Sequence, residues 1–162
     1  ELLRTNRINP VGRFENGDER FQLDVNSDLP IFLTEADINE LAQAKGANVA
    51  GLRVIFHDFG ISFGDLDVLY LAGGFGRHLN VESSRRIGLI PNIAESRIVQ
   101  VGNAAIEGAC IALLSKSKRV ELEQLAKKVK HCRLEAHESF FIFFVEGCQF
   151  HPVEISSLAR SG

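Results

Sequence analysis

Residues 67–76 read D-V-L-Y-L-A-G-G-F-G, an apolar run that ends in three closely spaced glycines. The run is too short for an ordinary helix, and its β-branched and aromatic residues favour a buried strand over 67–72. Glycines directly after a strand allow positive φ angles and let the backbone come close to another group. Because no Cβ stands in the way, that group is most often part of a nucleotide. This stretch is therefore where the sequence points to a ligand.

Length and composition indicate one globular domain. The chain has 162 residues, of which 45% are hydrophobic and 24% charged. Its formal net charge is −3 and no basic face is evident, so neither nucleic acid nor an anionic membrane is an expected partner. No stretch reaches the roughly 18–20 apolar residues of a membrane span, and no signal peptide is evident. We expect a cytoplasmic protein.

The three cysteines, Cys110, Cys132 and Cys148, are too few and too widely spaced for a disulfide framework. No Cys-x-x-Cys occurs, so the sequence offers neither a zinc ribbon nor a self-contained iron–sulfur site. We expect reduced thiols and no bound metal.

The first half of the chain predicts short extended segments followed by a long helix. After the tail of a helix at 1–8, extended segments are expected near 12–14, 20–25 and 30–33. Thr34 is a suitable N-cap for a helix that continues to 59 and ends at Gly60. Each glycine inside this helix, at 46 and 51, costs about 1 kcal/mol relative to alanine. Close packing against a neighbouring segment is the preferred explanation for these two glycines, and direct contact with a ligand is the alternative.

The second half alternates helices and strands. We expect a helix at 81–88, a strand at 97–101 that ends in Gly102-Asn103, and helices at 104–114 and 116–130. The segment 139–150 carries five phenylalanines, which favour a stripe facing the core; an exposed interface is the alternative. Residues 156–162 are expected to form a flexible tail after a single domain at 1–155.

This order of elements predicts an α/β fold. The early segments favour antiparallel pairing and the later strands parallel pairing, as in a ribonuclease-H-like mixed sheet with helices on both faces. In such sheets ligands lie beyond the carboxyl ends of the parallel strands, where both glycine-bearing loops, 73–76 and 102–103, are expected.

Four segments together resemble one family. They are L-T-E-A-D-I-N-E-L-A-Q-A-K-G-A (33–47), Y-L-A-G-G-F-G (70–76), R-I-G-L-I-P (86–91) and V-G-N-A-A-I-E-G-A (101–109). In this order they resemble the reductive activators of corrinoid proteins, which belong to the acetate/sugar kinase, heat-shock chaperone and actin superfamily. The resemblance implies one lobe of an actin-like ATPase domain that helps return a cobalt(II) corrinoid protein to cobalt(I).

The resemblance also implies the ligand and its residues. ATP or ADP with Mg would bind between this lobe and another, with the adenosine against the glycine motif. The implied binding residues are Gly73, Gly74, Phe75 and Gly76, with Asn103 and Lys45 added by their position in matching segments. The phosphate loop and the iron–sulfur domain of the family have no counterpart here. The chain therefore resembles the C-terminal lobe of a longer protein, and we expect the lobe alone to be inactive.

The sequence also allows one function of a different class and argues against two others. The lobe could instead be a dimerisation module, or a module that docks the corrinoid protein, with a vestigial nucleotide loop and the phenylalanine-rich segment as its surface. A dinucleotide-binding fold is not supported, because Leu79 stands where its third glycine should be. A hydrolase is not supported either, since the histidines are scattered and no serine lies in a Gly-x-Ser-x-Gly turn.

Overall fold

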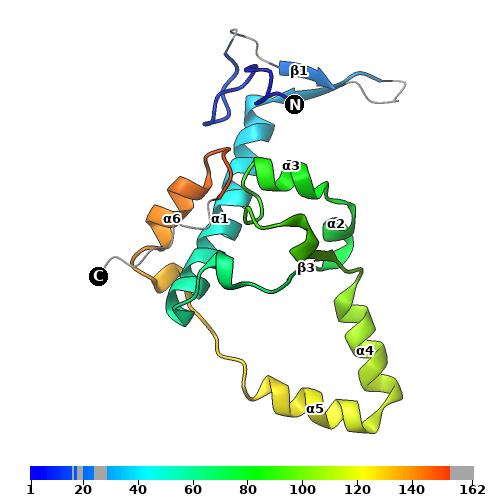
Figure 1. Ribbon diagram of the computed structural model, residues 1–162. Helices are drawn as coiled ribbons and strands as arrows, with labels where there is room; N and C mark the ends of the chain where they lie inside the picture. Colours follow the sequence, from blue (N-terminus) through cyan, green and yellow to red (C-terminus); the bar gives the residue numbers. More distant parts are fainter. Residues whose placement is uncertain (16, 18–19, 24–28, 154–162) are drawn as a thin grey trace.

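One long helix organises the molecule. The computed structural model describes residues 1–15, 17, 20–23 and 29–153. Helix α1 (Glu35–Phe59) runs through its middle, with an antiparallel hairpin at its N-terminal end and helix α6 (Phe140–Gly147) along one side (Figure 1). The predicted tail, 156–162, lies outside the described residues.

The ends of α1 are set by the residues that the sequence predicts. The Thr34 hydroxyl accepts a hydrogen bond from the Asp37 backbone N–H (3.2 Å), and the Asp37 carboxylate accepts one from the Thr34 N–H (2.8 Å). At the other end Gly60 takes the left-handed conformation, with φ of 65°, and its N–H reaches back to the last turn. The predicted helix is confirmed over 35–59.

The strands pair in the predicted senses but in two separate sheets. Strands β1 (Arg20–Leu23) and β2 (Ile31–Thr34) are antiparallel, whereas β3 (Leu69–Leu71) and β4 (Ile98–Gln100) are parallel. Among the described residues these pairs form two two-stranded sheets and not one continuous mixed sheet. The two sheets lie at different places along α1: the hairpin is at its N-terminal end, and the parallel strands pack against the core that contains Val49 and Phe56 (Figure 1).

The beginning of the chain differs from the prediction. Residues 1–8 form hydrogen-bonded turns instead of the tail of a helix, for example from the Arg7 N–H to the Leu2 carbonyl (2.9 Å). The segment near 12–14 pairs only through an isolated bridge between Ile8 and Phe14.

Short helices connect the remaining elements. They are η1 (Phe63–Asp65), α2 (Gly73–His78), α3 (Val81–Arg86), η2 (Glu95–Arg97), α4 (Ala104–Leu114), α5 (Lys116–Ala126) and η3 (Leu134–Ala136). Helices α4 and α5 extend away from the rest of the molecule, and the chain then returns to the C-terminal end of α1 (Figure 1). No helix in the described ranges is both long and apolar enough to cross a membrane.

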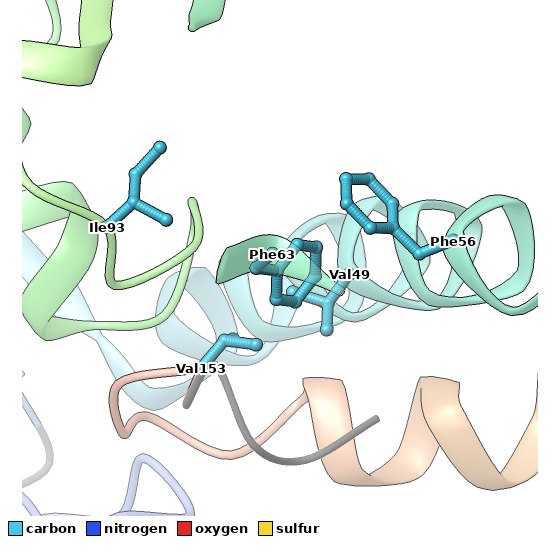
Figure 2. Packing of buried hydrophobic residues seen from close by; sticks show 5 residues of the cluster. All are labelled: Val49, Phe56, Phe63, Ile93 and Val153. Carbon is cyan, nitrogen blue, oxygen red and sulfur yellow. The ribbon is translucent and has the colours of Figure 1, made fainter. Parts of the chain in front are cut away.

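The main core lies on the side of α1 that faces the parallel strands. Val49 and Phe56 of α1 meet Phe63, Ile93 and Val153 there (Figure 2). The rings of Phe56 and Phe63 are tilted, with centroids 4.6 Å apart. Partly buried side chains of both parallel strands pack against this cluster. A second cluster near the hairpin contains Ile8, Ile38, Ala42 and Phe150.

Two glycines allow α1 and α6 to touch. A Cβ on Gly46 would lie 2.6 Å from the Cys148 sulfur and 2.9 Å from the Phe144 carbonyl oxygen. A Cβ on Gly147 would lie 3.1 Å from the Gly46 Cα. The contact between the two backbones therefore explains Gly46, and the packing interpretation is confirmed at this position.

The phenylalanine-rich segment faces both the core and the surface. Helix α6 ends at Gly147, so Phe150 lies beyond it and is buried at 5% exposure. Phe141 on the helix is 72% exposed, and Ile142 and Val145 are exposed beside it. The predicted core stripe is therefore only partly buried.

The helix crossing makes a direct stability prediction. We expect Gly46→Ala to lower the free energy of unfolding by about 1–3 kcal/mol, because the added methyl group overlaps backbone atoms of α6. The matched control is Gly108→Ala in α4, where an added Cβ would meet no atom within 4 Å. In this control the free energy of unfolding should rise by about 0.5–1 kcal/mol, because alanine has a higher helix propensity than glycine. Chemical denaturation measures the free energy of unfolding of both variants. Equal changes in Gly46→Ala and Gly108→Ala would contradict the close packing of α1 against α6.

Candidate functional site

The predicted glycine loop at 73–76 is the start of helix α2, because the chain turns into a helix directly after β3. This segment, which keeps the name glycine loop below, meets residues 102–103 at the carboxyl edge of the parallel strands. The Val101 N–H donates to the Leu71 carbonyl, and the Gly73 N–H donates to the Gly102 carbonyl, both at 2.9 Å. These bonds continue the strand pairing past the strand ends. The structure thus brings residues 73–76 and 102–103 together, as the predicted strand order requires.

The glycines of the first loop have different surroundings. Gly73 has a φ of +93°, and a Cβ built on Gly73 or Gly74 would meet nothing within 4 Å. Gly76 is buried instead, and its Cβ would lie 3.3 Å from the Leu71 carbonyl group. Gly73 and Gly74 therefore leave open space for a ligand, whereas Gly76 lets α2 fold back on β3.

Phe75 and Gln100 complete the first loop. Phe75 is 78% exposed in the first turn of α2. The Gln100 side-chain amide donates to the carbonyls of Gly76 and Leu79, each at 2.8 Å, and so fixes the end of α2. Gln100 was not among the predicted site residues. The signal that could have found it is a polar residue at the carboxyl end of a parallel strand.

Asn103 begins the helix that leaves the second loop. Its side-chain oxygen accepts a hydrogen bond from the Ile106 N–H at 3.1 Å, which makes it the N-cap of α4. The N-terminal end of a helix carries partial positive charge and free N–H groups. Since Asn103 follows Gly102, this helix end lies at the same edge as the glycine loop.

Lys45 lies elsewhere and has other partners. It belongs to α1, has no exposed surface, and donates hydrogen bonds to the carbonyls of Gly147 and Gln149. Burial lowers the pKa of Lys45 to about 8, and the nearby Cys148 opposes this shift. Its ammonium group therefore joins α1 to the end of α6 and the segment that follows, a role that its sequence position beside Gly46 could not reveal. The structure does not bring it to the glycine loop.

The residues at the edge can bind but do not perform acid–base or nucleophilic chemistry. Gly73, Gly74, Phe75 and Asn103 offer backbone groups, an aromatic ring and an amide. Such groups suit a flat, polar ligand held against the backbone. A phosphoryl transfer would need cationic and metal-binding groups in addition.

The fold and this edge define the class as one lobe of an actin-like domain. A family described as the C-terminal domain of RACo, the ASKHA domain, matches residues 3–160. The chain belongs to this family, and the α/β, actin-like fold expected from the sequence is confirmed. ASKHA denotes the acetate/sugar kinase, heat-shock chaperone and actin superfamily.

Known relatives are corrinoid activators. The chain is 32% identical over 117 residues to a [Co(II) methylated amine-specific corrinoid protein] reductase of Methanosarcina barkeri, covering 71% of this chain and 22% of that protein. It is 27% identical to the corrinoid activation enzyme RamQ of Eubacterium limosum over 146 residues, which are 88% of this chain and 25% of the relative. A solved reductive activator for corrinoid, iron-sulfur protein superposes with a TM-score of 0.80 at 29% identity, over 93% of this chain and 26% of the other. The chain thus spans about a quarter of the length of these proteins.

The burial of Lys45 predicts a pH dependence of stability. Its pKa is about 8 in the fold against an ordinary 10.5, so between these pH values the unfolded chain binds more protons. The wild type should therefore gain stability relative to Lys45→Met as the pH rises from 8 to 10.5, by at most about 3 kcal/mol. Below pH 8 the difference in the free energy of unfolding between the wild type and Lys45→Met should stay constant.

Urea denaturation across this pH range measures the effect. The control is Lys128→Met, which removes an exposed ammonium group beyond α5 and should leave the pH profile unchanged. A constant difference between wild type and Lys45→Met would contradict the assignment of Lys45 as a buried ammonium group.

Proposed function

We propose that the edge formed by Gly73, Gly74, Phe75 and Asn103 binds the adenosine part of ATP or ADP. The observation that supports this most is the open space above Gly73 and Gly74, directly beside the N-terminal end of α4. A nucleotide can approach the backbone there without meeting side-chain atoms. Gly76 packs against the Leu71 carbonyl group and so holds the glycine loop against β3.

We further propose that this lobe works inside an ATP-dependent reductive activator, which returns a cobalt(II) corrinoid protein to cobalt(I). The corrinoid activators among its relatives support this role, and a corrinoid protein is the proposed partner. Nucleotide binding between two lobes would favour a closed state in which the electron is transferred. The lobe alone would hydrolyse little ATP, because the phosphates and Mg need groups from the other lobe.

The iron–sulfur cluster of such an activator belongs, in this proposal, to another part of the protein. Cys110, Cys132 and Cys148 lie on α4, before η3 and after α6, and all three are free thiols. Their positions do not fit the clustered cysteines that ligate an iron–sulfur centre. We place the protein in the cytoplasm, where such thiols stay reduced.

Nucleotide titration followed by NMR tests the proposed site. ATP and ADP should shift the amide signals of residues 73–76 and 102–104, and Gly74→Val should abolish these shifts by filling the ligand's space. Since a Cβ on Gly74 meets no atom of the chain, the variant should keep the wild-type stability. Loss of binding is then a direct effect on the ligand.

Gly108→Val provides the control for this titration. Its Cβ also points into open space, but it lies on the second turn of α4 and outside the glycine loop. It should therefore bind nucleotide like the wild type. Absence of shifts at millimolar nucleotide in the wild type, or equal shifts in Gly74→Val, would refute the site.

A second candidate function is a dimerisation or docking module with a vestigial nucleotide loop. The exposed face of α6 favours it, because Phe141, Ile142 and Val145 are all 49% exposed or more. In this case the wild type should form a dimer, measured by light scattering, that Phe141→Gln weakens about tenfold or more through lost apolar contact. Phe75→Gln, an exposed phenylalanine on α2, is the control. A monomeric wild type would contradict self-association.

A further inference from the structure

Four side chains with metal-binding atoms gather at the C-terminal end of α1. His57 and Asp58 lie in its last turn, while Cys132 and His137 come from the segment that returns from α5 (Figure 1). We propose that His57, Asp58, His137 and the thiolate of Cys132 form a four-ligand site for a divalent transition metal such as Zn²⁺. This proposal is independent of the nucleotide site.

The distances around Asp58 support such a site. One carboxylate oxygen of Asp58 lies 3.6 Å from Nδ1 of His57 and 3.6 Å from Nε2 of His137. The ligand atoms of these three residues all lie within 4.8 Å of one another. Ligand atoms around a tetrahedral zinc ion are about 3.4 Å apart, given bonds of about 2.0–2.1 Å. Two of the three separations are therefore already close to those of a zinc site.

Cys132 lies beside these three residues but outside the group of atoms within 4.8 Å of one another, so its side chain would turn toward the ion to supply the fourth ligand. Its thiol donates a hydrogen bond of 3.7 Å to the other carboxylate oxygen of Asp58. When a metal ion binds, the sulfur bonds to the metal as the thiolate and the thiol proton is released to the solvent. A His₂AspCys set combines the nitrogen, oxygen and sulfur ligands that zinc accepts, whereas Mg²⁺ and Ca²⁺ prefer oxygen alone.

His137 is the least exposed of His57, Asp58 and His137. Its side chain is only 16% exposed, and the backbone N–H of Ser139 donates to its Nδ1 at 3.2 Å. Nε2 therefore carries the proton of the neutral ring and faces Asp58. Metal binding at Nε2 takes the place of this proton, and Nδ1 becomes protonated and gives up the long bond to Ser139. His57 contributes from an exposed position and can rotate to meet the ion.

The site would act as a structural clamp. Four protein ligands leave no open position for a substrate, which distinguishes structural zinc sites from catalytic ones. The ligands join the end of α1 to the segment that follows the protruding helices α4 and α5. A bound ion would therefore fix the return of these helices to the body of the molecule.

Metal titration of the full chain, without an added histidine tag, tests this site. Isothermal titration with Zn²⁺ should give one ion per chain, and Co²⁺ should produce tetrahedral d–d bands with a thiolate charge-transfer band. His137→Ala and Asp58→Asn should each weaken Zn²⁺ binding by roughly 100-fold or more. Cys132→Ser should remove the charge-transfer band. Zn²⁺ should also raise the melting temperature of the wild type.

Matched variants separate this site from adventitious binding. His151→Ala, Asp67→Asn and Cys110→Ser remove exposed residues of the same types outside the cluster and should bind Zn²⁺ like the wild type. If His137→Ala does not fold, the exposed His57→Ala serves in its place. Failure to bind Zn²⁺, equal binding by the cluster and control variants, or a cobalt complex without the thiolate band would each overturn the proposal.

Discussion

The direct contact between α1 and α6 is the constraint on which the rest of the described structure depends. Gly46 and Gly147 let the two backbones approach, and the buried ammonium group of Lys45 donates to two carbonyls just beyond that contact. Arg53 of α1 adds an ion pair with Glu146 of α6. A bulkier residue at either glycine would separate the helices and break these polar contacts together, leaving buried groups without partners.

This contact also positions the glycine edge, although the edge lies on the other side of α1. The segment after α6 continues to Val153, which pairs with Pro91 and joins the core beside Phe63. The same core holds Leu69 and Ile98 of the parallel strands. The loops after these strands therefore rest on a scaffold that the segment after α6 helps to complete, and a binding site on such a scaffold needs little rearrangement.

Local chemistry made part of this structure predictable. The Thr34 cap, the Gly60 stop and the strand within 67–72 each follow from the local sequence, and each was found where it was predicted. The glycines that follow the strand begin a helix instead of the predicted loop. Lys45 could not be placed in this way, because its partners lie more than 100 residues away in the sequence. The same holds for His57 and His137, whose proximity depends on how the chain returns from α5. The separation into two sheets among the described residues likewise depends on how distant segments pack along α1 and not on any strand's own sequence.

We propose that the lobe contributes the adenosine side of a nucleotide site and that another lobe contributes the phosphate side. The most direct measurement is a crystal structure of this chain bound to a non-hydrolysable ATP analogue. The account predicts adenosine density against the backbone of Gly73 and Gly74, within reach of the N-terminal end of α4. Nucleotide density elsewhere, with protein atoms covering Gly73 and Gly74, would contradict it.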